Sequence, residues 1–275
     1  MNSRIGRKGA RMAVELIDGS IFLHIPKTGG TWVTEVLADC GLIKRKFAHK
    51  HLDAARLSLA DRVADGKDLL RELIWPKFKR KIVRGLGFQA PEPPFLPQGR
   101  FCFMFVRNPL KWYESYWRYS VGLHWRAFDT ADNPFQWHPL DDLRNLRNDD
   151  FNEYVRGIAR KHPGFVAYLY GLYHAPQVRF VGRQESLVDD LVAVLRTLDL
   201  PFDEQFVRSR KPINVSRVSE TAAVWDPELK REVERLEYAA FARYGYTESP
   251  SSMGGALRKS RLSFGSGEHK AAMAS

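Results

Sequence analysis

Short apolar runs alternate with amphipathic stretches along most of the chain. Three runs have the length and apolar character of buried strands, at residues 21–25, 101–106 and 178–181. After each run, apolar or aromatic residues recur every three or four positions, which predicts helices over 31–39, from Pro109 onward, and over 185–198. Strands that alternate with helices in this way predict an α/β fold, with a parallel sheet flanked by helices on both faces.

Capping residues mark several of the expected helix ends. Pro109 suits the first turn of the helix that follows the second strand. Asp226 as N-cap, Pro227 in the first turn and Gly245 as C-cap predict a last helix over 226–244. A short helix is expected over 152–160, and two further helical pieces over 53–64 and 67–75. The Pro-rich connector 89–99 interrupts any helix there.

The 275 residues are enough for one core, and two smaller domains are the alternative. Composition favours a packed chain, with 44% hydrophobic and 12% aromatic residues. We expect a flexible N-terminal arm over 1–19, a single domain over 20–248 and a disordered basic tail over 249–275. Within the domain, 44–100 is basic and mixed, and 122–150 is an aromatic, polar loop.

The formal net charge of +11 favours anionic partners, namely phosphorylated cofactors, acidic glycans, nucleic acid or a membrane surface. The N-terminus lacks the apolar core of a signal peptide, and no apolar run reaches the roughly 18 residues that span a bilayer. We therefore expect a cytoplasmic protein without a transmembrane segment. Cys40 and Cys102 are too few for a disulfide framework or a metal cluster, and both are expected to be buried thiols.

The turn after the first strand carries the strongest chemical signal. Residues 22–33 read FLHIPKTGGTWV, a strand that leads through a lysine and two glycines into a helix. Unpaired backbone N–H groups at a helix start favour a phosphate or sulfate. Gly29 and Gly30 permit close approach, Thr28 and Thr31 add hydroxyl donors, and Lys27 adds an ammonium group. The lysine precedes the glycines, which excludes a Walker A loop. An ordinary strand–helix turn that contains a lysine is the alternative.

This stretch resembles the 5′-phosphosulfate loop of sulfotransferases that use 3′-phosphoadenosine 5′-phosphosulfate (PAPS), especially the carbohydrate-type enzymes. Residues 106–121, VRNPLKWYESYWRYSV, are similar to the second motif of that family. Weaker similarity extends over 178–201 and 214–246. The resemblance implies a P-loop-NTPase-like sheet, the sulfotransferase fold. It also implies that residues 27–32, Lys27 to Trp32, bind the 5′-phosphosulfate, and that Arg107 and Ser115 bind the 3′-phosphate. An ion pair at a strand end and a plain surface serine are the alternatives for Arg107 and Ser115.

Sulfuryl transfer to an alcohol also needs a base, and His suits that role near neutral pH. Residues 47–57, FAHKHLDAARL, are similar to the stretch of heparan-type 2-O-sulfotransferases in which the second histidine is the proposed base, which maps onto His51. His24 is expected to be a buried histidine behind the loop, and His124 and His138 are alternatives near an acceptor. A metal site at His49 and His51 lacks a third ligand, and the resemblance implies no metal.

Two further groups of residues are candidates for ligand contacts. In the family, a C-terminal loop folds over the nucleotide, so Lys211 or Arg217 would clamp the 3′-phosphate, unless both belong to a solvated basic loop. The aromatic residues after Pro109 either form a wall for a sugar or adenine ring or pack in the core; they are Trp112, Tyr113, Tyr116, Trp117 and Tyr119.

The resulting expectation is a PAPS-dependent sulfotransferase, with Lys27 and His51 as catalytic residues. The acceptor would be a hydroxyl of a glycan, glycolipid or glycosylated metabolite, bound by 44–100 and 122–150, and peripheral contact with a membrane stays open. A kinase-like phosphotransferase is disfavoured, because no Asp is placed to hold Mg²⁺ at a strand end. A nucleic-acid-binding protein is disfavoured, because the basic residues form no known reading motif.

Overall fold

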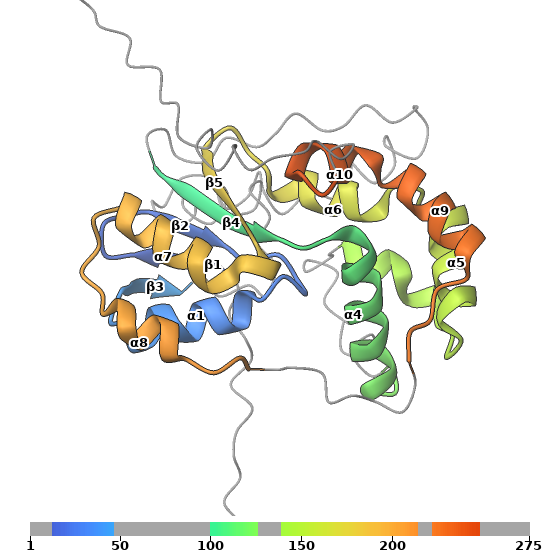
Figure 1. Ribbon diagram of the computed structural model, residues 1–275, viewed down its shortest axis with the longest axis horizontal. Coiled ribbons are helices and arrows are strands. Elements are labelled where there is room, and N and C mark those ends of the chain that lie inside the picture. The colour runs from blue at the N-terminus through green and yellow to red at the C-terminus, as the bar shows by residue number, and fades with distance from the viewer. Residues whose placement is uncertain (1–12, 47–99, 126–138, 214–221, 248–275) are drawn as a thin grey trace, which may run out of the picture.

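The computed structural model describes residues 13–46, 100–125, 139–213 and 222–247. A five-stranded sheet with the order β3-β1-β2-β4-β5 forms the centre of the molecule, and helices pack on both sides (Figure 1). The strands are β1 (Ala13–Leu16), β2 (Ile21–Leu23), β3 (Ile43–Lys46), β4 (Cys102–Val106) and β5 (Val178–Arg183). His49, His51, His138, Arg217, the pieces 53–64 and 67–75, and the tail over 249–275 lie outside the described residues.

The sheet is mixed, which corrects the expectation of a purely parallel one. β2 pairs in parallel with β4, and β4 in parallel with β5, whereas β1 runs antiparallel to both of its neighbours, β2 and β3. Among the described strands, β1 alone therefore runs antiparallel to the others. The three predicted strands are present, and helices follow each of them, whereas β3, between α1 and β4, was not predicted.

Residues 13–19 do not belong to a flexible arm, which corrects the predicted boundary at 19. β1 is fully buried and forms a hairpin with β2 through a short turn. The Asp18 carboxylate accepts a hydrogen bond from Ser20 N, and Gly19 supplies the positive φ of 86° that the turn requires. Asp-Gly between two apolar runs is a hairpin signal, and it explains why this segment joins the sheet.

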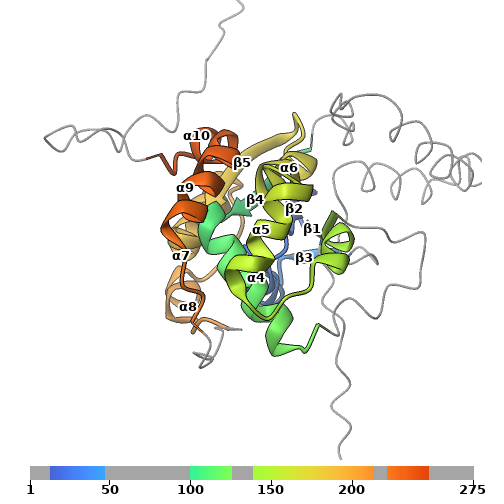
Figure 2. The ribbon, with the colours of Figure 1, turned by 90° about the vertical axis from the view of Figure 1, so that its right-hand side faces the viewer.

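Each face of the sheet buries its own hydrophobic core. On one face, α1 (Gly30–Asp39) and α7 (Leu187–Thr197) pack against Phe22, Phe103 and Phe105, with α8 (Glu204–Ser209) beside them. On the other face, Ile21, Leu23, Cys102, Met104 and Val106 pack against five helices: α4 (Pro109–Gly122), α5 (Phe151–Lys161), α6 (Phe165–Tyr173), α9 (Pro227–Leu236) and α10 (Tyr238–Tyr244). Figure 2, turned towards this second group, shows α4, α5 and α6 in front of the sheet.

The predicted helix ends are close to the observed ones, except that one predicted helix is divided into two. Asn108 caps α4, and the Asp226 side chain accepts hydrogen bonds from Glu228 N and Leu229 N at the start of α9. The helix predicted over 226–244 is instead two helices, α9 and α10, separated at Glu237. Gly245 ends α10 with a positive φ of 66°. Helix α6 and the 3₁₀ helix at Pro139–Leu146 were not predicted.

The two cysteines have different surroundings. Cys102 lies fully buried in β4, and burial raises the pKa of its thiol to about 12. Cys40, after α1, is only partly buried, so the prediction of a buried thiol is confirmed for Cys102 alone. Among the described residues, no helix combines the length and hydropathy needed to cross a membrane.

Candidate anion-binding site at the carboxyl edge of the sheet

Three neighbouring parallel strands end at one edge of the sheet, and each end carries a basic side chain. The loop with Lys27 follows β2, Arg107 follows β4, and Arg183 is the last residue of β5. The parallel register pairs Val106 with Arg183, so Arg107 lies one residue beyond that pair. Ligands of open α/β sheets bind at this carboxyl edge.

The main chain of the β2–α1 loop is fixed from several sides. The Trp112 indole N–H of α4 donates to Pro26 O over 2.9 Å, and Thr28 Oγ1 donates to Ile25 O over 2.9 Å. Arg107 Nη1 lies 3.5 Å from Lys27 O. The loop turns through the left-handed region twice, at Lys27 with φ 68° and at Gly29 with φ 86°. These contacts hold the main chain of the loop in one conformation.

Val33 is the first residue of α1 whose N–H donates to a main-chain acceptor within the described chain, Gly29 O, over 3.2 Å. The N–H groups just before it, over 28–32, are the unpaired donors that a helix start offers to an anion. The Thr28 hydroxyl supports the loop instead of facing a ligand. The Trp32 ring packs in the core, and its indole N–H donates to Lys211 O over 3.2 Å. That bond brings the segment with Lys211 next to the first turn of α1.

The second glycine of the loop is required by packing against a histidine. A Cβ at Gly30 would lie 2.2 Å from the ring of His24, which is closer than real Cβ contacts come. His24 is buried behind the loop and stacks on Phe22 with ring centroids 6.0 Å apart. Its position agrees with the predicted buried histidine. Glycine is required at position 29 for a different reason, because the positive φ and the nearby Leu187 side chain both disfavour a larger residue there.

Gly30→Ala is expected to destabilise the protein by about 1–3 kcal/mol, the usual cost of forcing a methyl group into a packed site. The measurement is the free energy of unfolding in urea. Gly171→Ala, within α6, is the control, because a Cβ there meets open space and a helix gains about 0.5–1 kcal/mol from Ala in place of Gly. Equal unfolding midpoints for Gly30→Ala and the unmodified protein would contradict the packing argument.

The Lys27 ammonium lies over an aromatic ring of α4. Its Nζ is 4.1 Å from the ring centroid of Tyr119, which is 39% exposed. Burial, with the nearby Arg107 charge as a second cause, lowers the pKa of Lys27 to about 8. An anion placed beside this ammonium would offset both effects, because an opposite charge favours the protonated form.

One face of α4 points towards the loop. Trp112 and Tyr119 both contact it and lie two turns apart on the helix, and Ser115 lies between them at helical spacing on the same face. Ser115 is buried, so the alternative of a plain surface serine is wrong. The four remaining aromatic residues of the predicted wall, Trp112, Tyr113, Tyr116 and Trp117, are core residues, which confirms the alternative for them. Tyr119 is the exception.

Arg107 has a fixed main chain, and its side chain contacts Lys27 O but no described carboxylate. Its N–H donates to Tyr170 Oη over 3.2 Å, and the same hydroxyl donates to Arg107 O over 2.8 Å. The buried Nε finds no acceptor among the described residues, and no described carboxylate lies within ion-pair distance of the guanidinium. Burial lowers the pKa of Arg107, an effect that the Glu185 charge partly opposes. The predicted alternative of an ion pair is not observed in this part of the chain.

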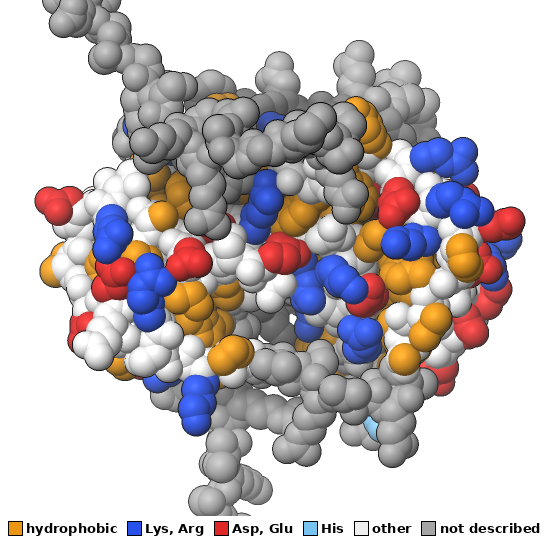
Figure 3. Space-filling view, viewed as in Figure 1, with side chains coloured by type: hydrophobic (Ala, Val, Ile, Leu, Met, Phe, Trp, Pro, Cys, Tyr) orange, Lys and Arg blue, Asp and Glu red, His pale blue; other side chains and the backbone are white. Residues whose placement is uncertain are grey.

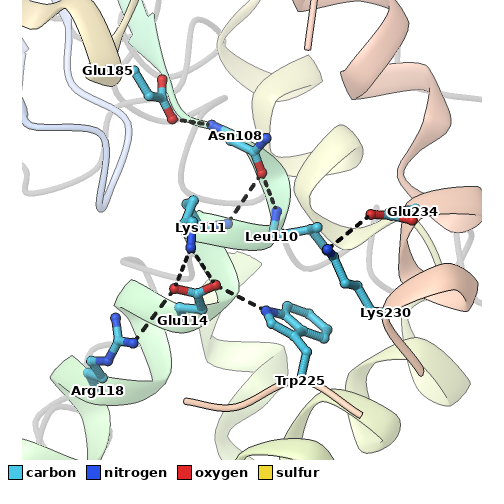
Figure 4. A network of polar contacts seen from close by, with 9 residues as sticks. All are labelled: Asn108, Leu110, Lys111, Glu114, Arg118, Glu185, Trp225, Lys230 and Glu234. Atoms are coloured by element: carbon cyan, nitrogen blue, oxygen red, sulfur yellow. Dashed lines mark hydrogen bonds and ion pairs between the residues drawn. The ribbon is translucent and has the colours of Figure 1, made fainter. Parts of the chain in front are cut away.

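Other cations near the start of α4 are already paired (Figure 4). Glu114 accepts hydrogen bonds from Lys111 Nζ over 3.0 Å and from Trp225 Nε1 over 3.0 Å, and it forms an ion pair with Arg118. Glu185, which the sequence prediction missed, accepts from Asn108 N over 2.9 Å and so fixes the turn between β4 and α4. Lys111 and Arg118 therefore share one carboxylate partner, whereas Arg107 has none among the described residues.

Lys and Arg side chains gather across the middle of the face drawn in Figure 3, beside a hollow in that surface. His124, a predicted alternative base, is exposed just after the end of α4. Within the described ranges, no cluster of His, Cys, Asp or Glu could hold a metal ion. Comparison of the chain with protein-family models, with curated proteins and with solved structures gives no match in any of the three. Chemically, the site offers an amide cradle, an ammonium and a guanidinium for a ligand with more than one anionic group.

Proposed function

We propose that the protein is a PAPS-dependent sulfotransferase, which moves a sulfuryl group to a hydroxyl of an acceptor that contains carbohydrate. The observation that carries the proposal is that Lys27, in the loop after β2, lies next to Arg107, at the end of the neighbouring strand β4, and that no described carboxylate pairs with Arg107. The resemblance of residues 22–33 and 106–121 to the two PAPS motifs supports it. The strand–loop–helix arrangement is compatible with a P-loop-NTPase-like fold of the sulfotransferase type.

The proposed donor spans the two positions. Its 5′-phosphosulfate lies on the N–H groups of 28–32, and its 3′-phosphate lies between Arg107 and Ser115. Arg offers several N–H donors in a rigid fork that fits phosphate oxygens. Lys211, whose segment lies beside α1 through the Trp32 contact, and Arg217, outside the described residues, would cover the nucleotide.

In the proposed reaction, the acceptor oxygen attacks the sulfur atom in line with the bond to the 5′-phosphate oxygen. The new S–O bond forms as that bond breaks, and adenosine 3′,5′-bisphosphate leaves. Lys27 stabilises the charge that develops on the leaving oxygen. The proton of the acceptor passes to a base, for which His51 stays the candidate. The positive φ of Lys27 supports this role, because strained backbone clusters at functional sites.

The acceptor would approach beside Tyr119. Its partly exposed ring lies next to the Lys27 ammonium, so a hydroxyl that reaches the sulfuryl group passes close to it. Aromatic rings present flat apolar surfaces of the kind that pack against sugar rings. The acceptor therefore fits a hydroxyl carried on a ring better than one at the end of a flexible chain.

Binding of adenosine 3′,5′-bisphosphate tests the proposal by calorimetry. We expect the unmodified protein to bind it, and Arg107→Met to weaken binding by about 1.5–3 kcal/mol, the scale of a hydrogen bond to a charged group. Arg179→Met is the matched control, because Arg179 is an exposed arginine near the opposite end of β5. No heat with the bisphosphate, together with Mg²⁺-dependent ATP turnover, would overturn the proposal in favour of a phosphotransferase.

A further inference from the structure

A second arginine at the same edge of the sheet, Arg183, resembles Arg107 in having a buried Nε without an acceptor among the described residues. Arg183 ends β5, and its main chain is fixed because its N–H donates to Asp190 Oδ2 over 2.7 Å. The same carboxylate oxygen accepts from Ser186 Oγ over 2.7 Å. Asp190 thus holds this turn through one main-chain and one side-chain hydrogen bond, and no ion pair within the described ranges joins it to the Arg183 guanidinium.

The side chain of Arg183 packs beside the end of α10. Its guanidinium carbon is 5.0 Å from the centroid of the Tyr246 ring, and its Nη2 would lie 2.5 Å from a Cβ at Gly245. Glycine at position 245 thus makes room for the guanidinium as well as ending the helix. The aromatic ring and the helix end hold the arginine stem in one place.

The charge of Arg183 has no described counter-ion. Its Nε is buried without an acceptor in the described part of the chain, and no ion pair there involves its guanidinium. The nearest acid in sequence, Glu185, uses its carboxylate to accept from Asn108 N and from Tyr246 Oη. By contrast Arg144, whose Nε is also buried without an acceptor, pairs with Asp141 through Nη2. A buried N–H without an acceptor is costly, so the Nε of Arg183 favours an anion from outside the chain.

Arg107 and Arg183 are neighbours along the sheet edge. Adjacent strands lie about 4.8 Å apart, and Arg107 directly follows the residue that pairs with Arg183. Two long side chains anchored so closely can both reach one ligand group. A phosphate monoester carries up to two negative charges and three free oxygens, which suits two guanidinium groups better than one.

We propose that Arg183 is a further ligand-binding residue, which together with Arg107 holds the 3′-phosphate of the nucleotide. The inference rests on the proposed function, and it assigns the 3′-phosphate a second guanidinium from β5. It follows that the site distinguishes a nucleotide with a 3′-phosphate from one without it mainly through two arginines on neighbouring strands.

The test compares two ligands by calorimetry, adenosine 3′,5′-bisphosphate and adenosine 5′-monophosphate. For Arg183→Met, which keeps most of the side-chain stem, we expect affinity for the bisphosphate to fall about tenfold or more, and affinity for the monophosphate to stay unchanged. Arg183→Lys should recover part of the loss, because it keeps the charge without the fork. Arg179→Met, on the same strand, should leave both affinities unchanged.

Each outcome separates this inference from the proposed function. If the unmodified protein binds the bisphosphate and Arg107→Met weakens it, but Arg183→Met does not, the role of Arg183 is refuted and the proposed function stands. If Arg183→Met weakens both ligands equally and lowers the melting temperature, Arg183 acts only through packing, and the inference fails. If the unmodified protein does not bind the bisphosphate, both fail.

Discussion

Lys27→Met is expected to lower the rate of sulfuryl transfer by about 10²–10³-fold, the loss typical when one donor to a developing charge is removed. The substitution keeps the length of the side chain and removes the ammonium that lies over Tyr119. The measurement is transfer of labelled sulfate from PAPS to a panel of polysaccharide, glycolipid and small hydroxyl acceptors. Lys111→Met is the matched control, since Lys111 is ion-paired with Glu114. Near-normal turnover by Lys27→Met would refute the assignment of the loop.

The same side chain gives the site a pH dependence with a defined sign. Lys27 has a pKa lowered from 10.5 to about 8, so in the free protein it loses its charge as the pH rises through 8. Binding of an anion requires the charged form, and affinity for adenosine 3′,5′-bisphosphate should therefore fall about tenfold between pH 7 and pH 9. Lys27→Arg stays charged throughout that interval and should lose this dependence. A flat profile for the unmodified protein would show that Lys27 does not contact the anion.

Glu237→Ala is expected to destabilise the protein by about 3 kcal/mol or more, because it leaves buried donors without an acceptor. The fully buried Glu237 carboxylate accepts from Tyr113 Oη over 2.7 Å, from Val166 N over 2.9 Å and from Ala167 N over 2.8 Å. Burial raises the pKa of Glu237. The two amides belong to the first turn of α6, whose N-cap, a glycine, provides no side chain. Glu237 thus takes the place of a capping residue.

Urea unfolding measures this effect. Glu237→Gln, which keeps one side-chain oxygen, should lose less than Glu237→Ala. Glu234→Ala, on α9 and in a surface ion pair, should change stability by less than about 0.5 kcal/mol. Because α6 also carries Tyr170, which holds the Arg107 main chain, we expect Glu237→Ala to weaken nucleotide binding as well. Equal stability of Glu237→Ala and Glu234→Ala would refute the capping role.

Elements with a clear local pattern were predicted closely. The strand at 101–106 and the capped start of α9 are examples, because a short apolar run and an Asp-Pro pair act through their immediate neighbours. The helix α6 was missed for the opposite reason. Its sequence, FVAYLYGLY, is apolar around most of its circumference and lacks a polar stripe from which a helical period could be recognised.

The candidate site was predicted in part. The residues of the β2–α1 loop and Arg107 fall at one edge of the sheet, as the order of strands and motifs indicated. Arg183, Glu185 and Tyr246 carry no local signal that separates them from other polar residues. They lie at this edge because β5 lies next to β4 and α10 ends beside it. His51 and Arg217 stay predictions.

By itself, the sequence determined where the elements with a clear local pattern begin and which turn offers a cradle of amides, because burial period and capping act over a few residues. Only the tertiary structure decided which charges remain without a partner. Lys111 and Arg118 are paired with Glu114, whereas Arg107 and Arg183 have no described carboxylate partner, although all four are basic side chains near the same edge. The pairs of Lys111 and Arg118 with Glu114 are local, because they join residues three and four positions apart in α4. The lack of a carboxylate partner for Arg107 and Arg183 is decided by the tertiary structure, because it depends on which acidic side chains from distant segments come within ion-pair distance.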